Sequence, residues 1–127
     1  MKPSSLAFLL LLTAAWSQAA APALNSADAA ALKRDSARCG AHADVDACYD
    51  AIRRNPSDPA LLVSLGDALV RANRPTDAIR NYRRAAVLAP NTRGLPAKIS
   101  AAEAKLTAMN AAANKRYSNA APETQSH

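Results

Sequence analysis

The stretch from Pro59 to Thr92 constrains the fold more than any other part of the chain. Apolar residues recur in it at three- and four-residue spacing, which places them on one face of a helix. A polar break at Asn73-Arg74-Pro75 divides the stretch into two such patterns. Asp58 can cap the first helix, and Pro59 suits its first turn, where a missing N–H costs nothing. The sequence therefore predicts two amphipathic helices that pack together as a hairpin.

Gly66 lies in the middle of the first predicted helix, where glycine is a poor helix former. Its presence there indicates a packing requirement, namely close approach of the second helix. That helix is expected to open near Thr76 and to end before Pro90. We expect Gly66 to face Ala78, so that two small residues let the helices nest.

The same positions resemble the signature of a tetratricopeptide repeat. They are Leu62, Leu65, Gly66, Leu69, Ala78, Tyr82, Ala85 and Pro90. Leu62 stands where the family most often has Trp, and Asn73 stands where it usually has Gly. The resemblance implies an all-α fold of antiparallel helical hairpins, stacked as a short right-handed solenoid. It identifies a scaffold and leaves the partner unnamed.

The repeat spacing extends toward the N-terminus and predicts a degenerate first hairpin over residues 26–58. Pro56 precedes Pro90 by one repeat length, and Cys48 precedes Tyr82 by the same interval. The first helix of this hairpin is expected from Ser26, which can cap it, to Cys39, with Gly40 ending it. The second helix is expected from Asp44, again as a cap, to Asn55.

After the repeat at 59–92, residues 93–110 are expected to form a capping helix opened by Pro96. Ile99, Ala102, Leu106 and Met109 make one apolar stripe on it. Residues 111–127 are expected to be a frayed or disordered tail, because few of them could bury apolar area.

The N-terminal residues predict a cleavable secretory leader over 1–19, followed by a linker over 20–25. Lys2 supplies a positive start, residues 6–15 are apolar, and Ser17-Gln18-Ala19 offers small residues for cleavage. The apolar run is too short to span a bilayer comfortably. We therefore expect a periplasmic or secreted bacterial protein that has no stable membrane insertion after cleavage.

The two cysteines, Cys39 and Cys48, predict a disulfide in an exported protein, pinning the first hairpin across its turn. Two buried free thiols are the alternative, and a metal site with His42 would have only three ligands. We expect no metal and no cofactor.

No Gly-rich phosphate loop, paired-His zinc motif or Ser elbow is present, so we expect no enzymatic activity. Tyr49 and Tyr82 are expected to lie in the core. The net charge is −1 over residues 20–58, +3 over 59–92 and +3 over 93–127. Nucleic acid is disfavoured as a partner by the export signal and by the lack of interleaved aromatic residues.

The resemblance implies that the first helix of each pair lines a concave groove that binds an envelope or secreted protein or peptide. The groove residues implied are Val63, Asp67, Val70, Arg71, Lys98, Ala101 and Lys105. Because Asp67 is acidic, capture of a peptide carboxylate is not expected. A helix or extended peptide with apolar anchors and some acidic residues fits better.

Two alternatives use other surfaces of the chain. Self-association into a homo-oligomer could bury the exposed end around Ile99, Leu106 and Met109. The basic half of the chain could instead bind anionic lipid or an acidic cell-wall polymer.

Overall fold

The computed structural model describes residues 23–120, and these residues form an all-helical fold. The predicted all-α class is confirmed, and no strand occurs within the described range. The helices in chain order are α1 (Ser26–His42), α2 (Val45–Arg54), α3 (Pro59–Arg71), α4 (Pro75–Leu88) and α5 (Leu95–Ala120). The predicted leader over 1–19 lies outside the described residues, as does the end of the chain from residue 121.

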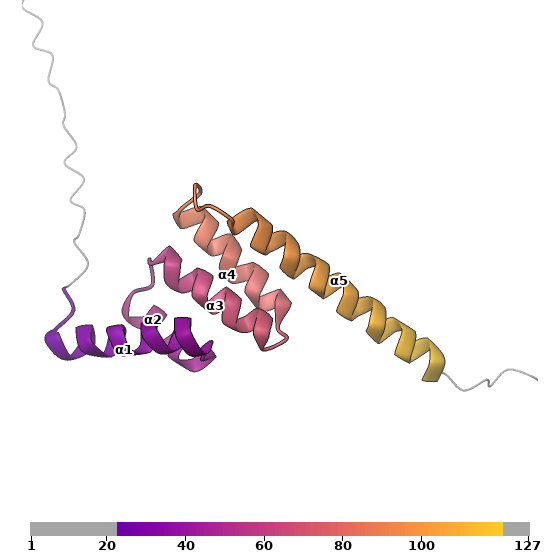
Figure 1. The fold of residues 1–127 in the computed structure, drawn as a ribbon, viewed down its shortest axis with the longest axis horizontal. Helices are drawn as coiled ribbons and strands as arrows, with labels where there is room; N and C mark the ends of the chain where they lie inside the picture. The colour runs from indigo at the N-terminus through magenta and orange to yellow at the C-terminus, as the bar shows by residue number, and fades with distance from the viewer. Residues whose placement is uncertain (1–22, 121–127) are drawn as a thin grey trace, which may run out of the picture.

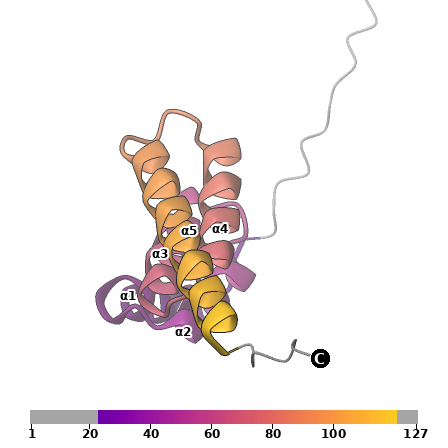
Figure 2. The same cartoon turned by 90° about the vertical axis from the view of Figure 1, so that its right-hand side faces the viewer.

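Consecutive helices pack against one another, and α3 with α4 forms the centre of the molecule. Figure 1 shows α1 and α2 against one side of this pair and α5 along the other side. Viewed from the α5 end, α5 lies in front of α3 and α4 and is joined to α4 by the loop at the top (Figure 2). Within residues 23–120, no helix is both long enough and apolar enough to cross a membrane.

Three of the helices begin with an aspartate or asparagine whose side chain accepts a backbone N–H. Asp44 caps α2 through the N–H of Ala47, and Asp58 caps α3 through the N–H of Ala60, as predicted. The predicted cap at Ser26 is wrong, because Asn25 accepts the N–H of Asp28 and Ser26 is already helical. Asparagine one residue earlier offers an equally good cap, so composition alone could not choose between them.

The turns of the two hairpins lie at different distances from the ends of their second helices. Gly40 does not end α1, which continues to His42 and turns at Ala43, a residue with φ of 52°. The corresponding left-handed residue between α3 and α4 is Asn73, with φ of 60°. The ends of α2 and α4, Arg54 and Leu88, are 34 residues apart in sequence, whereas Ala43 and Asn73 are 30 apart, a difference of about one helical turn. The first hairpin therefore has a longer first helix and a shorter second helix.

The core contains the apolar residues of the second hairpin that the sequence pattern predicted, together with residues of the other helices. Leu62, Leu65, Leu69, Ala78, Tyr82 and Ala85 are all buried, together with Cys39, Cys48, Leu95 and Ala102. Pro90 lies just after α4 and is exposed. The expectation for Tyr49 is wrong, because its side chain lies on the outer surface of α2 and is 41% exposed.

Gly66 makes room for an aromatic ring and not for Ala78 as expected. A Cβ atom built on Gly66 would lie 2.3 Å from Cε1 and 2.6 Å from Cδ1 of Tyr82. Ala78 is buried but is not among the closest groups. The close approach between α3 and α4 is thus a contact between the Gly66 backbone and the ring of Tyr82.

The last helix is longer than the sequence pattern predicted. It begins at Leu95 and continues to Ala120, so the expectation of a disordered tail is wrong for residues 111–120. Alanine is the best helix former, and no glycine or proline interrupts residues 97–120. Residues 110–120 are all exposed and project beyond the α3–α4 pair (Figure 1).

Candidate functional site

The residues predicted to line a groove come from α3 and α5, and the structure brings two pairs of them into contact. The ammonium group of Lys98 donates to both carboxylate oxygens of Asp67, at 2.7 and 2.9 Å. Lys105 donates to the backbone carbonyl of Val70 at 2.9 Å. These two lysines therefore tie α5 to α3 across the predicted groove.

Tyr82 adds α4 to the same network. Its hydroxyl donates to a carboxylate oxygen of Asp67 at 2.6 Å. Burial raises the pKa of Tyr82 well above its usual value of 10.0, and the hydrogen bond to Asp67 and the charge of that carboxylate add to the rise. The neutral phenol is thus held as a donor, and Asp67 joins three helices through one side chain.

The remaining predicted groove residues differ in accessibility. Val63 and Val70 are half-buried and pack against the core cluster. Arg71 and Ala101 are exposed. The face of α3 and α5 therefore has a polar centre that is already paired, with two valines beside it and two accessible positions at its margin.

Two of the links that hold the first hairpin involve buried groups, and the sequence indicated one of them. The predicted disulfide is present between Cys39 in α1 and Cys48 in α2, and both residues are buried. The second link joins the buried carboxylate of Asp35 to Arg54 at 2.8 Å. Nothing in the sequence spacing of this pair distinguished it from the other charged residues of the two helices.

Metal binding has no support in the part of the chain that the structure describes. Within residues 23–120, no group of three or more His, Cys, Asp or Glu side chains could hold a metal ion. His42 is exposed at the last position of α1, and both cysteines are consumed by the bridge.

A second surface lies between α4 and α5, where a crevice of about 400 Å³ is open to solvent. It is lined by Thr76, Ile79, Arg80, Arg83, Glu103 and Leu106. Arg83 of α4 donates to Glu103 of α5 at 2.8 Å across it. Sequence reasoning singled out Leu106 as part of an exposed end but missed the contribution of α4. The spacing of Thr76, Ile79 and Arg83 along one face of that helix was the available signal.

Comparison with known proteins gives no relative for this chain. No protein-family model, no curated protein and no solved structure matches it.

Proposed function

We propose that this chain is a non-enzymatic interaction scaffold of the bacterial envelope that binds a partner protein or peptide through the face of α3 and α5. The observation that carries the proposal is the network centred on Asp67. Lys98 and Tyr82 hold this carboxylate from two other helices, so the geometry of the face is fixed before a partner arrives. Fixing a binding surface in advance lowers the entropic cost of association.

A tetratricopeptide-like stack is the arrangement that we propose for the helices. Two pairs of residues one repeat length apart in α2 and α4 have the same burial: Ala51 and Ala85 are fully buried, as are Cys48 and, within 2%, Tyr82. This equivalence of α2 and α4 supports the proposal of two related hairpins followed by α5 as the capping helix, although Leu62 and Leu65 of α3 are buried where α1 has the half-buried Asp28 and Ala31. The one-turn shift at Ala43 is the departure from a regular repeat.

Export is part of the proposal and is supported by the disulfide. Bridges between cysteines form and persist in oxidising compartments such as the periplasm. The bridge, together with the leader predicted over residues 1–19, supports the proposal of a periplasmic or secreted location.

The chemistry of the face favours a segment with apolar anchors and acidic groups. Val63 and Val70 offer apolar area, while Arg71 is a cation that the structure leaves exposed. Asp67 is already paired with Lys98, so it does not repel an incoming carboxylate as an isolated aspartate would.

The test is cross-linking in intact cells followed by identification of the linked protein. The variant Arg71→Glu with Ala101→Glu changes only exposed positions and should abolish the cross-link. Arg53→Glu, on α2 and 73% exposed, is the matched control and should retain it. Recovery of the same partner by the Arg71/Ala101 variant would refute this face as the binding site. Asp67 is unsuitable for such a test, because its substitution would break the network between three helices.

A further inference from the structure

The crevice between α4 and α5 belongs to a longer surface on which apolar side chains recur beside charged ones. Ile79 and Leu106 lie within the crevice. Val87 follows Thr76 by three helical turns, and Tyr117 follows Leu106 by three, so each lies on the same helix face as its counterpart. Val87 is 82% exposed and Tyr117 is 83% exposed. An exposed apolar side chain therefore lies beyond each end of the crevice.

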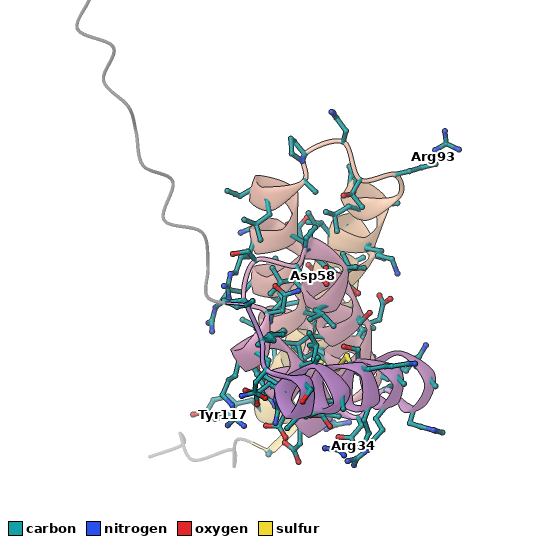
Figure 3. The ribbon with its side chains drawn as sticks, turned by 90° about the vertical axis from the view of Figure 1, so that its left-hand side faces the viewer. Arg34, Asp58, Arg93 and Tyr117 are labelled. Carbon is teal, nitrogen blue, oxygen red and sulfur yellow. A yellow bond between two sulfur atoms is a disulfide. The ribbon has the colours of Figure 1, made fainter. Side chains whose placement is uncertain are left out.

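The length of this surface suits a third helix lying along the other two. The helices α4 and α5 are antiparallel, which places Val87 near the loop and Tyr117 near the far end of α5. Figure 3 shows Tyr117 projecting outward at the end of the molecule opposite to Arg93, which lies in that loop. From Ile99 to Tyr117 the surface runs roughly 27 Å along α5, at about 1.5 Å per residue.

The charges beside the crevice select the kind of helix that would fit. The side chains of Arg80 and Arg83 are 77% and 65% exposed. Their partners are Asp77 at 3.6 Å and Glu103 at 2.8 Å. Exposed ion pairs contribute little stability, so an incoming carboxylate can take the place of either partner at low cost. Residues 59–92 and 93–127 each carry a net charge of +3, which favours an acidic ligand.

A second copy of this chain fits the surface poorly. The outer half of its α5 carries Lys115 and Arg116, and its own crevice carries Arg80 and Arg83. Docking two copies face to face would place like charges opposite one another, and such juxtaposition opposes association.

We propose that the α4–α5 surface binds an amphipathic helix of a partner protein that carries acidic side chains beside its apolar face. Its apolar side chains would pack on Ile79, Leu106, Val87 and Tyr117, and its carboxylates would pair with Arg80 and Arg83. This surface lies apart from the face of α3 and α5, so the two binding proposals stand or fall separately.

The test uses a fluorescein-labelled synthetic helical peptide of matching length, with leucines at three- and four-residue spacing and glutamates on both flanks of that stripe. Its binding to the purified protein, with the disulfide intact, is measured by fluorescence anisotropy. The expected result is saturable binding that weakens with salt. A peptide with lysine in place of each glutamate, and one with glutamine in place of each leucine, should both fail to bind. Equal binding of either control peptide would overturn the proposal.

Variants locate the binding. Arg80→Glu with Arg83→Glu should weaken binding by about tenfold or more, since both changes reverse charge at the interface. Val87→Ser with Tyr117→Ser should also weaken it, and both residues are so exposed that folding is unaffected. Arg53→Glu and the Arg71/Ala101 variant should bind as the unmodified protein does. Loss of binding in the Arg71/Ala101 variant alone would overturn the proposal in favour of the α3–α5 face.

Sedimentation of the unmodified protein over a concentration series tests whether a second copy of the chain binds this surface. A monomer throughout is expected. A dimer that is abolished by Val87→Ser with Tyr117→Ser would show that a second copy covers this surface, and would overturn the proposal of an acidic partner helix.

Discussion

At the scale of single residues, the contact between Gly66 and Tyr82 determines how closely the central helices approach. Tyr82 is 2% exposed, and its ring occupies the space that a side chain on Gly66 would need. The ring cannot move aside easily, because its hydroxyl is also bonded to Asp67. A large aromatic residue and a glycine thus act as one unit in this core.

We predict that Gly66→Ala destabilises the protein by about 1–3 kcal/mol, as overpacking of a well-filled core usually does. The added methyl group would lie 2.3 Å from the Tyr82 ring, which more than offsets the gain in helix propensity. Urea unfolding followed by circular dichroism measures the change.

Gly40→Ala provides the matched control for this substitution. Gly40 is also inside a helix, but a Cβ there would meet nothing within 4 Å. It should stabilise the protein by up to about 1 kcal/mol through helix propensity alone. Similar effects of the two substitutions would contradict the packing role of Gly66.

The pKa of Tyr82 predicts a specific loss of stability at alkaline pH. Because burial and Asp67 raise the folded-state pKa above the unfolded value, the contribution is complete below pH 10.0 and is lost as pH rises through the folded-state pKa. Tyr82→Phe should lower stability at neutral pH by about 1 kcal/mol, through the lost hydrogen bond. It should also flatten the alkaline decline.

The measurement is the free energy of unfolding of both proteins between neutral and strongly alkaline pH. The other titrating groups are common to the two proteins, so the difference between the curves isolates Tyr82. Curves that stay parallel above the ordinary tyrosine pKa would mean that ionisation of Tyr82 does not differ between the folded and unfolded states.

At the scale of helices and turns, the disulfide stabilises the hairpin that has the weaker apolar pattern. Only Asp35 and Cys39 are buried in α1, whereas α3 buries six residues. The bridge closes a loop between residues nine apart in sequence, across the turn at Ala43. The bridge therefore gives the first hairpin a covalent source of stability, because α1 contributes little stability by burying apolar side chains.

We predict that Cys39→Ala with Cys48→Ala lowers the free energy of unfolding by about 2.5–3 kcal/mol, the range expected for a loop of this size. Urea unfolding with and without reductant gives an independent measurement on the unmodified chain, and reduction should shift the midpoint in the same direction. An unchanged midpoint after complete reduction would contradict a stabilising role for the bridge.

The helices themselves were well predicted from local signals, and their ends less well. Helix starts can be recognised at Asp44 and Asp58, because an aspartate side chain there accepts an unpaired backbone N–H of the first turn. Pro59 adds to the signal, because proline fits the first turn of a helix. Neither signal depends on the rest of the fold. The prediction that Gly40 ends α1 failed because a glycine can also lie inside a helix, and the turn comes three residues later at Ala43. Ala43 turns the chain in a left-handed conformation that alanine seldom adopts, so composition could not reveal it.

At the scale of the whole molecule, the outer half of α5 contributes little to stability. Residues 111–120 are exposed throughout, whereas Leu95 and Ala102 in the first half are buried. We predict that a chain ending at Asn110 unfolds within about 0.5 kcal/mol of the full chain, as for other changes at exposed sites. Its helical circular dichroism signal should fall by the share that residues 111–120 contribute.

Leu95→Ala is the contrasting change in the same helix. This side chain is 2% exposed in the core cluster, so its truncation should cost about 2–5 kcal/mol. A comparable loss of unfolding free energy on removing residues 111–127 would show that the outer half of α5 is packed in solution.

The candidate site was only partly predictable, because its chemistry depends on pairs that are distant in sequence. Asp67 and Lys98 were both identified as facing a groove, yet their bond to each other joins two helices separated by the whole of α4. Tyr82 was assigned to the core by its spacing, while its hydroxyl reaches that same carboxylate. The crevice escaped prediction for a similar reason, since it exists only where α4 and α5 meet.

The anchoring of α5 at one end makes this helix a lever. Its first half is fastened to α3 by Lys98 and Lys105, and its outer half extends roughly 15 Å further with no support, at about 1.5 Å per residue. A molecule that binds near Tyr117 and pulls on α5 would load the contacts of the first half of the helix, which are its packing on α4 and the hydrogen bonds of Lys98 and Lys105. Tension on the outer half of α5 would thus reach the bond between Lys98 and Asp67, in the centre of the molecule.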